Sequence, residues 1–356
     1  MTFFDILEPW DGVGVLVRRD QPTGTWIFIA LHDDTLGPAT GGCRMKVYER
    51  PEDGLRDALR LSEGMTYKWA AMDFPFGGGK TVLAVPRPLD GEERRGLLHR
   101  YGAILNSLGG RYGTGADLGT TTEDMLTIAE VSEHVIGVHG RTEGPMDPSP
   151  FTALGVFEGI RAAVRHVHGS DDLSGRRILV EGVGAVGGDL VRRLADAGAA
   201  LLVADLATEA ATTIAGRYGG HVVPLDEVPD TECEVYAPCA VGATLNRGSI
   251  ERLRAGIVAG AANNQLATPA DAASLHERGI VYAPDYVING GGAMAFTSLY
   301  LGADVPTAEA RVRGIGSRIE TILKRAMERD ESPVAAAREL AEGVLARGSA
   351  EGVVQN

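Results

Sequence analysis

The sequence lacks an excess of positive charge. Its 356 residues include 34 lysines and arginines against 48 aspartates and glutamates, which gives a formal net charge of −14 at pH 7. A nucleic-acid-binding surface needs clustered positive charge to meet the phosphates, and docking to an anionic membrane needs the same. The composition therefore argues against a nucleic-acid partner and against a membrane partner.

Long apolar runs and targeting signals are also missing. No apolar stretch reaches the roughly 18 residues that a membrane-spanning helix requires. The first ten residues, MTFFDILEPW, contain an early acid and no basic segment, so they do not resemble a signal peptide. The three cysteines (Cys43, Cys233 and Cys239) are odd in number and form no CxxC pair. We therefore expect a reduced, cytoplasmic protein.

Histidine is scarce, which bears on metal binding. The eight histidines are scattered along the chain, and only His166 and His168 lie close together. No spacing typical of a metal-ligand cluster emerges from them. The sequence therefore predicts no metal site.

The first half of the chain alternates strand-like and helix-like segments. Residues 12–32 are apolar or alternate around a polar turn at 20–24, which predicts a hairpin. Apolar residues recur at helical spacing in 51–72 and again in 90–107. Between these two segments, the three glycines at 77–79 predict a turn before the strand-like TVLAVP. This alternation indicates an α/β domain.

The second half predicts a parallel sheet. After a helix at 151–168, helical patterns alternate with six strand-like runs, which are RRILVEGVG, AALLVADL, GHVVPL, CEVYAPCA, GIVAGAA and GIVYAPDYVING. This order is typical of a doubly wound α/β fold. Two helices close the chain, one over about 306–329 and one beginning at Ser332-Pro333, an N-cap followed by a first-turn proline.

The motif GVGAVG at 182–187 has the spacing and context of a dinucleotide-binding turn. It follows a strand and precedes a helix with an apolar face, and Asp205 ends the next strand at roughly the expected 20 residues. Gly182 allows the tight turn, Gly184 lets the backbone approach a pyrophosphate, and Gly187 lets helix and strand pack closely. Asp205 would accept hydrogen bonds from the adenosine ribose and repel a 2′-phosphate, which favours NAD over NADP. A glycine turn without a cofactor is the alternative.

Four short stretches of the first half place polar residues in apolar surroundings, and these are GGCRM (41–45), MTYK (65–68), GGGKT (77–81) and TGADLGTT (114–121). Lys80 follows three glycines and precedes apolar residues, so we expect it to be partly desolvated. Desolvation lowers the pKa of a lysine from about 10.4 toward the working pH and makes its amine a candidate general base. A solvated surface lysine is the alternative for both Lys68 and Lys80.

These motifs, in this order, resemble the Glu/Leu/Phe/Val dehydrogenase superfamily, and specifically its leucine, valine and phenylalanine dehydrogenase branch. The resemblance spans nearly the whole chain, whereas a single GxGxxG would carry little weight. It rests on LGPATGGCRM (36–45), GMTYKWA (64–70), PFGGGKTV (75–82), GADLGTTTEDM (115–125), PSPFTALGVFEG (148–159), the glycine turn, YAPCAVGATLN (236–246), VAGAANNQLA (258–267) and YAPDYVINGGG (282–292).

The resemblance implies a two-domain α/β fold with the active-site cleft between the domains, and a homo-oligomer. We expect residues 1–147, joined by the C-terminal helix at about 330–356, to form a substrate-binding and oligomerisation domain. Residues 148–329 would form a Rossmann-type NAD-binding domain. The glycine-, proline- and serine-rich segment 140–150 is the best candidate for the hinge.

The resemblance also assigns roles to individual residues. Lys80 aligns with the catalytic lysine, Asp117 with the aspartate that handles protons beside it, and Lys68 with the lysine that holds the substrate carboxylate. The other expected substrate contacts are Asn263, Gly41 and Gly42. Beside Gly182, Gly184, Gly187 and Asp205, the expected cofactor contacts are Arg44, Ser149, Thr152, Val183, Ala185, Val186, Cys239, Ala240, Ala261 and Asn289.

The implied reaction is the reversible, NAD-dependent oxidative deamination of an L-amino acid to the 2-oxo acid and ammonia. The positions that contact the substrate side chain in the family are occupied here by Thr40, Met65, Ala116, Ala293 and Phe296. None is cationic, so a buried γ-carboxylate would lack a counter-charge, which disfavours glutamate. The small Thr40 and Ala293 favour phenylalanine or a similarly bulky apolar side chain. Phe296 fills space and favours leucine or valine instead.

Two other classes of function compete with this interpretation. A non-catalytic nucleotide-binding homologue would have lost Lys68, Lys80 or Asp117, and the sequence retains all three. A hydroxy-acid dehydrogenase usually needs a histidine acid or base near a substrate-binding arginine, and no histidine falls inside the glycine-rich motifs. The two lysines therefore favour an amino acid dehydrogenase.

Overall fold

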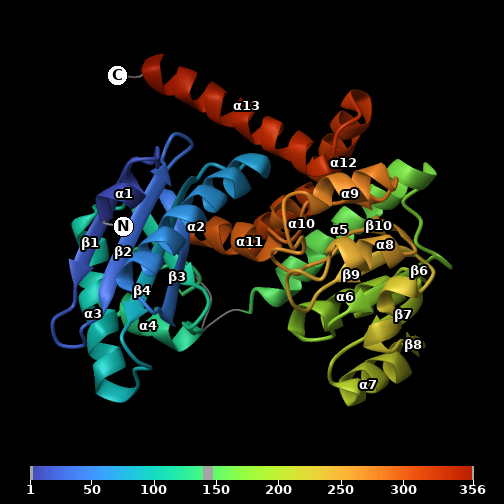
Figure 1. Ribbon diagram of the computed structural model, residues 1–356, viewed down its shortest axis with the longest axis horizontal. Helices are drawn as coiled ribbons and strands as arrows, with labels where there is room; N and C mark the ends of the chain where they lie inside the picture. The colour runs from blue at the N-terminus through green and yellow to red at the C-terminus, as the bar shows by residue number, and fades with distance from the viewer. Residues whose placement is uncertain (1–2, 139–146, 355–356) are drawn as a thin grey trace. The chain divides into compact units, whose positions relative to one another are not determined.

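The structure, a computed structural model, describes residues 3–138 and 147–354. The chain divides into two compact units, unit 1 (Met1–Met146, Phe296–Ala303 and Ala341–Asn356) and unit 2 (Asp147–Ala295 and Asp304–Leu340). Each unit contains a sheet with helices packed on it (Figure 1), so the predicted α/β fold with two domains is confirmed. Most of the predicted hinge at 140–150 lies outside the described residues.

The sheet of unit 1 has five strands in the order β1-β2-β4-β3-β5. Strand β2 runs antiparallel to its neighbours β1 and β4, and β3 runs parallel to β4 and β5. The strands are β1 (Gly14–Arg19), β2 (Trp26–Asp33), β3 (Ala39–Val47), β4 (Gly77–Val85) and β5 (Tyr112–Ala116). Strands β1 and β2 form the hairpin that the sequence predicts at 12–32.

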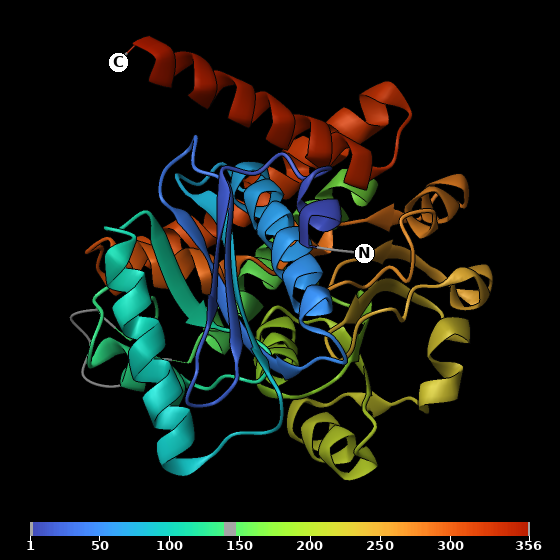
Figure 2. The ribbon, with the colours of Figure 1, turned by 60° about the vertical axis from the view of Figure 1, so that its left-hand side comes forward.

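Helices cover both faces of this sheet. Helix α2 (Pro51–Ala71) lies along one face, as Figure 2 shows, and its buried residues join a core that includes Phe28, Leu55 and Val82. Helices α3 (Gly91–Ser107) and α4 (Thr122–Ala129) enclose a second core on the other face. The short α1 (Phe3–Leu7) packs beside α2. The helices predicted at 51–72 and 90–107 are confirmed.

The glycines at 77–79 do not form the predicted turn, because they are the first three residues of β4. A Cβ on Gly78 would lie 2.0 Å from Oγ1 of Thr66 on α2. A Cβ on Gly79 would lie 2.6 Å from the ring of Tyr112 on the opposite face. Glycine is needed here for close packing inside a buried strand, and not for the positive φ that a turn requires.

The sheet of unit 2 has six parallel strands in the order β11-β10-β9-β6-β7-β8. They are β6 (Arg177–Glu181), β7 (Ala200–Ala204), β8 (His221–Val222), β9 (Cys233–Pro238), β10 (Ala255–Val258) and β11 (Val281–Tyr282). This is the strand order of a doubly wound dinucleotide-binding sheet, in which the direction of winding reverses between β6 and β9. Ligands bind such sheets beyond the carboxyl ends of these two strands.

Helices pack on both faces of the second sheet. On one face, a core that includes Leu179, Tyr236 and Leu275 lies beneath α8 (Arg247–Arg252) and α9 (Asp271–Glu277). Helix α5 (Ser149–His168) contacts both α6 (Ala185–Asp196) and α12 (Val305–Arg329). The remaining helices are α7 (Thr208–Tyr218), the 3-10 helix η1 (Leu225–Asp230), α10 (Asp285–Ile288), α11 (Gly291–Tyr300) and α13 (Pro333–Val354).

The last predicted strand, GIVYAPDYVING, is mostly wrong. Only Val281–Tyr282 form β11, and Asp285–Ile288 form α10. Pro284 stands between them and has no N–H to donate to a ladder, so the strand ends before it and the helix begins after it. Among the described residues, no helix is long and apolar enough to cross a membrane.

Candidate active site

Lys80 is buried inside the sheet of unit 1. It lies on β4 opposite Ala30 of β2, and only 5% of its surface is exposed. Side chains alternate along a strand, so Lys80 shares the face of Val82 and Ala84, which packs against α2. The amine is therefore held on the face that α2 covers.

Asp117 lies directly beside this amine. It follows the carboxyl end of β5, and its Oδ1 is 3.1 Å from Nζ of Lys80. Its Oδ2 accepts a hydrogen bond of 2.8 Å from Nε of Arg44 on β3. A Cβ on Gly42 would lie 2.8 Å from Cβ of Asp117, so the bare backbone of Gly42 makes room for this carboxylate. The fold thus brings together residues that are 37 positions apart in sequence.

The pair has the protonation behaviour of a base with an anionic partner. Burial lowers the pKa of Lys80, and the attraction of Asp117 opposes this effect without cancelling it. Burial alone would raise the pKa of Asp117, but the charges of Lys80 and Arg44 outweigh it and lower that pKa. Asp117 is therefore ionised near neutral pH, and Lys80 loses its proton more readily than a solvated lysine does.

Arg44 belongs to this cluster of unit 1. Besides Asp117, its guanidinium contacts Asp57 of α2, with Nη1 at 2.9 Å from Oδ2. The same Oδ2 accepts a hydrogen bond of 2.7 Å from the hydroxyl of Tyr48. No sequence motif marks Asp57, although Asp57, Leu61, Met65 and Lys68 follow one stripe of α2 at helical spacing.

The predicted substrate residues line the second half of α2 and the start of β3. Met65 packs on Gly41, since a Cβ on Gly41 would lie 3.3 Å from its Cγ. Lys68 is half-buried in the last turn of α2, one turn beyond Met65. The indole of Trp69 donates a hydrogen bond of 3.3 Å to the carbonyl of Thr40, which is buried. The chain has four lysines (Lys46, Lys68, Lys80 and Lys324), and two of them stand at this site.

The residues predicted to contact the substrate side chain are divided between the units. Thr40, Met65 and Ala116 belong to unit 1, as does Phe296, whereas Ala293 belongs to unit 2. The ring of Phe296 rests on Gly137, where a Cβ would lie 2.8 Å from the ring. Gly137 also has a φ of +90°. Glycine is therefore required here both by the backbone conformation and by the close approach of the Phe296 ring.

The glycine turn of unit 2 connects β6 to α6 at the switch point of the sheet. Gly182 has a φ of +92°, and a Cβ there would lie 2.6 Å from Cβ of Ala240, which follows β9. A Cβ on Gly187 would lie 1.8 Å from the carbonyl oxygen of Gly182. By contrast, Gly184 caps the N-terminus of α6, and nothing lies within 4 Å of its Cβ position. The turn is therefore crowded by protein at two glycines and open at the third, which suits a pyrophosphate at the helix N-terminus.

Asp205 is oriented by the backbone on both sides of it. Its Oδ2 accepts a hydrogen bond of 2.8 Å from the N–H of Val183, and its Oδ1 accepts one of 2.8 Å from the N–H of Ala207. Two large apolar side chains are exposed, Leu206 directly after Asp205 at 90% and Val241 in the loop after β9 at 68%. Sequence reasoning missed both, because exposure cannot be derived from residue type.

Three further predicted residues of unit 2 meet around one amide. Nδ2 of Asn289, which is buried, donates to Oδ1 of Asn263 at 2.7 Å and to the carbonyl of Ala261 at 3.3 Å. Cys239 follows β9, and its N–H donates to the carbonyl of Glu181 at 2.7 Å. Burial raises the pKa of its thiol to about 12, so the sulfur stays protonated and is no nucleophile.

The N-terminus of α5 holds the last two predicted residues, Ser149 and Thr152. The N–H of Ser149 donates to the side chain of Asp147 at 2.8 Å. The hydroxyl of Thr152 donates to the carbonyl of Pro148 at 3.1 Å, and a Cβ on Gly292 would lie 2.7 Å from that hydroxyl oxygen. The helix N-terminus and the start of α11 are thus in close contact.

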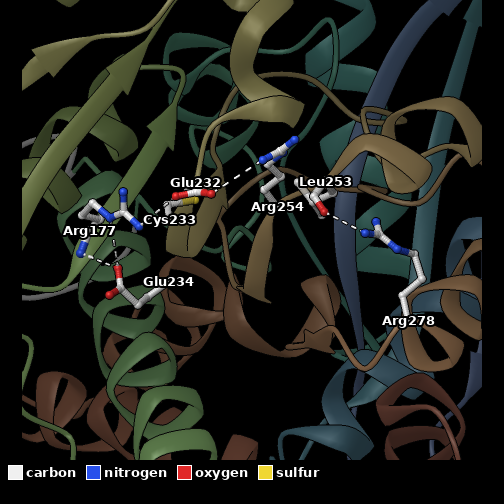
Figure 3. A pocket seen from close by; sticks show the side chains of 7 residues that line it. All are labelled: Arg177, Glu232, Cys233, Glu234, Leu253, Arg254 and Arg278. Atoms are coloured by element: carbon white, nitrogen blue, oxygen red, sulfur yellow. Dashed lines mark hydrogen bonds and ion pairs between the residues drawn. The ribbon is translucent and has the colours of Figure 1, made fainter.

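A hollow of about 410 Å³ in unit 2 is separate from this site. It lies at the amino ends of β6 and β9, which begin at Arg177 and Cys233. Figure 3 shows the residues that line it, which are Arg177, Glu232, Cys233, Glu234, Leu253, Arg254 and Arg278. Arg177 begins β6 and Gly182 directly follows this strand, so the hollow lies at the amino end of the strand and the glycine turn at its carboxyl end. In the described part of the chain, no group of three His, Cys, Asp or Glu residues could hold a metal ion.

The comparisons with known proteins agree with this geometry. The profile of the Glu/Leu/Phe/Val dehydrogenase dimerisation domain matches residues 17–134, and that of Glutamate/Leucine/Phenylalanine/Valine dehydrogenase matches residues 203–329. A leucine dehydrogenase of Bacillus subtilis is 41% identical over 98% of this chain and 95% of its own length. A phenylalanine dehydrogenase of Caldalkalibacillus thermarum is 37% identical over 92% of this chain and 90% of its own.

A solved structure supports the same assignment. The crystal structure of L-tryptophan dehydrogenase from Nostoc punctiforme superposes with a TM-score of 0.87 at 37% identity, over 97% of this chain and 99% of that one. The relatives and the solved structure match this chain over nearly its full length, and the two profiles match residues 17–134 and 203–329. The chain therefore belongs to the Glu/Leu/Phe/Val dehydrogenase family.

Proposed function

We propose that this protein interconverts an apolar L-amino acid with its 2-oxo acid and ammonia, and that Lys80 and Asp117 carry the proton transfers. Its family makes it an oxidoreductase that acts on CH–NH2 donors with NAD. The observation that carries the assignment of residues is the ion pair of 3.1 Å between Lys80 and Asp117 in a buried setting. A fold kept only for nucleotide binding has no need of a buried amine, which is costly to maintain.

Each residue has a step that its chemistry fits. Lys68 neutralises the α-carboxylate of the substrate and thereby orients the Cα–H bond. Bound NAD would supply the hydride acceptor for this carbon, and Lys68 would hold the Cα–H bond toward it. Neutral Lys80 then takes a proton from the water that attacks the resulting iminium carbon, and Asp117 stabilises the ammonium that Lys80 becomes. Lys80 then returns its proton to the carbinolamine nitrogen and takes the proton of the hydroxyl group, so that the C–N bond breaks, ammonia leaves and the 2-oxo acid forms. The reverse sequence is reductive amination.

The residues of unit 2 fit NAD. Gly184 leaves the N-terminus of α6 open for the pyrophosphate, and Asp205 is preset to accept hydrogen bonds from the ribose. The exposed side chains of Leu206 and Val241 offer apolar surface to the adenine ring. Asn263 and Asn289 would assist at the nicotinamide and substrate end.

The substrate side chain is apolar and bulky in this proposal. Thr40 is buried and lies beside Trp69, which stacks with Phe74 at 5.6 Å between ring centroids. An apolar wall of this kind favours phenylalanine or another large side chain, whereas leucine and valine remain the alternative. The domain roles predicted for 1–147 and 148–329 belong to the same proposal, as does a homo-oligomer, which a profile named for dimerisation supports.

A panel of L-amino acids tests the proposal in one experiment. Purified protein is mixed with NAD and each amino acid at alkaline pH, and NADH formation is followed by its absorbance. We expect a signal with apolar amino acids and none with glutamate, and a rate about 10²–10⁴-fold lower from the Lys80→Ala variant. The absence of any amino-acid-dependent NADH signal would contradict the proposed reaction, and sedimentation as a monomer would contradict the oligomer.

A further inference from the structure

Two charged residues, Arg44 and Asp57, connect the pair of Lys80 and Asp117 to helix α2. Arg44 contacts Asp117 through Nε at 2.8 Å and Asp57 through Nη1 at 2.9 Å. Lys80, Asp117, Arg44 and Asp57 thus form a line of alternating charges. The side chains of Arg44 and Asp57 are only 19% and 16% exposed, so water screens these contacts less than it screens a surface ion pair.

We propose that Arg44 and Asp57 are positioning residues, which hold Asp117 against Lys80 and set how readily Lys80 gives up its proton. The proposal rests on the proposed function, in which Lys80 is the base. It differs from the sequence-based expectation for Arg44, which assigned this residue to the cofactor. Two nitrogens of Arg44 bond the carboxylates of Asp117 and Asp57 in unit 1. These contacts hold Arg44 beside the Lys80–Asp117 pair.

Asp57 has the partners that such a role requires. The hydroxyl of Tyr48 donates to its Oδ2 at 2.7 Å, and Nη2 of Arg60 donates to its Oδ1 at 2.8 Å. Burial alone would raise the pKa of Asp57, but the hydrogen bonds from Tyr48, Arg60 and Arg44 lower it to about 2. Asp57 is therefore a permanent negative charge over the working pH range, and it offsets part of the positive charge of Arg44.

Other titratable groups lie on the elements packed around Lys80. On β3, Cys43 is paired with Thr81 and points to the opposite face of the sheet, and burial raises the pKa of its thiol, so it stays neutral. On β2, His32 lies two residues from Ala30 on the same face, where its Nδ1 bonds Oγ1 of Thr66 at 2.9 Å. On α2, Lys68 adds a positive charge to the same stripe as Asp57. Arg44 differs in that its guanidinium bonds both Asp117 and a second carboxylate, Asp57.

The two residues act on Lys80 with opposite sign. Loss of Asp57 leaves the charge of Arg44 uncompensated, draws Asp117 toward Arg44, and lowers the pKa of Lys80. Loss of Arg44 removes a cation that disfavours the ammonium and releases Asp117 to Lys80, so it raises the pKa of Lys80. A merely structural contact would lower stability in both cases and would not move the pKa of Lys80 in opposite directions.

The pKa of Lys80 can be measured without turnover, because the chain has only four lysines. Lysine labelled with ¹³C at Cε gives one signal per residue in NMR spectra, and the Lys80→Met variant identifies that of Lys80. We expect Asp57→Asn to lower the pKa of Lys80 by about 0.5–1 pH unit and Arg44→Gln to raise it by about as much. Asp57→Glu should restore the wild-type titration, because it keeps the charge.

Asp20→Asn is the matched control. Asp20 is a buried carboxylate of unit 1 that bonds Arg100 through both oxygens, at 2.5 and 2.9 Å, in the β1–β2 hairpin. Its loss should lower the thermal transition and leave the titration of Lys80 unchanged. In active enzyme, the pH dependence of kcat/KM should shift in the same direction as the NMR titration for each variant.

The outcomes separate this inference from the proposed function. If the protein deaminates no amino acid but Asp57→Asn still lowers the pKa of Lys80, the reaction is wrong and the positioning role stands. A pKa of Lys80 that is unchanged in Asp57→Asn would overturn the positioning role even in an active enzyme. A shift of the Lys80 pKa in the same direction in Asp57→Asn and Arg44→Gln would also overturn the positioning role. Should Arg44→Gln not fold, Asp57→Asn with its Asp57→Glu rescue decides alone.

Discussion

Tyr112 donates its hydroxyl to the carbonyl of Gly41 at 2.8 Å, and its ring occupies the space that a side chain on Gly79 would fill. It belongs to a chain of buried hydroxyls that continues through Thr81 and Tyr101 to Thr114. These residues lie on the face of the sheet opposite α2. These hydroxyls therefore support the backbone next to Lys80 and Gly42 from the face of the sheet opposite α2.

Removal of the Tyr112 hydroxyl should impair substrate binding as well as stability. Tyr112→Phe leaves the buried carbonyl of Gly41 without this donor, at a cost of about 1–3 kcal/mol, and loosens a segment that we expect at the substrate. The KM for the amino acid should rise several-fold, with a smaller change in kcat. Tyr101→Phe is the control, because it disturbs the same hydroxyl chain and leaves the bond to Gly41 intact. Steady-state kinetics and thermal unfolding measure both effects, and equal KM values in the two variants would contradict the role of Tyr112.

Two glycines of the dinucleotide turn should respond to alanine in different ways. Gly187→Ala places a Cβ 1.8 Å from the carbonyl oxygen of Gly182, so the variant should unfold at a markedly lower temperature. Gly184→Ala meets no atom of the protein within 4 Å, so it should keep its thermal transition. It should nevertheless weaken NADH binding about tenfold or more, because the methyl group enters the space of the pyrophosphate. Calorimetry and NADH fluorescence titrations check the pair, and normal NADH affinity in Gly184→Ala would exclude the pyrophosphate there.

The pattern of strands and helices was predictable where apolar periodicity is strong. The hairpin, the long helices and the alternation of strands and helices in the second sheet follow from apolar periodicity and from turn residues. The glycines at 77–79 were placed in a turn, because residue type alone does not distinguish glycine needed for a positive φ from glycine needed for close packing. The segment at 281–288 was placed in a strand, because the helix that follows Pro284 is only four residues long.

The candidate site was predictable only where a motif marks it. Lys80 and Asp117 were found from their glycine-rich surroundings and from the family resemblance. The contacts of Arg44 with Asp117 and Asp57 depend on how β3, β5 and α2 pack, which spacing along the chain does not encode. The same applies to Tyr112, whose partner Gly41 lies 71 residues away.

Asp205 should control the choice between the two nicotinamide cofactors. Its carboxylate is held by the N–H groups of Val183 and Ala207, and its charge opposes a 2′-phosphate. Asp205→Ser should lower the preference for NAD over NADP, expressed as the ratio of kcat/KM values, by about tenfold or more. Asp196→Asn removes an equal charge from the exposed end of α6 and should leave that ratio unchanged. Equal use of the two cofactors by the unmodified enzyme would refute the role of Asp205.

Lys68 should act on the substrate carboxylate and not on the cofactor. Lys68→Ala removes one charge-assisted contact, so kcat/KM for amino acids should fall about 100-fold while NADH affinity stays within a factor of two. Lys324→Ala serves as the control, because that lysine is exposed on α12. A Lys68→Ala variant with near-normal kcat/KM would show that another group binds the carboxylate.

Lys80 carries the most demanding prediction, because the proposed chemistry passes through its amine. Lys80→Ala should lower kcat by about 10²–10⁴-fold and leave NADH binding almost intact, since the loss falls on proton transfer. Burial lowers the pKa of Lys80 in the folded protein, so deamination should accelerate as the pH rises through a value below the usual 10.4 or so. The unfolded chain holds this proton to higher pH, so the wild type should gain stability relative to Lys80→Met as the pH rises between the two pKa values. Rate profiles and thermal transitions at pH 7 and 10 measure both trends. A variant that retained a large share of kcat with an unchanged pH profile would move the search for the base to Asp117.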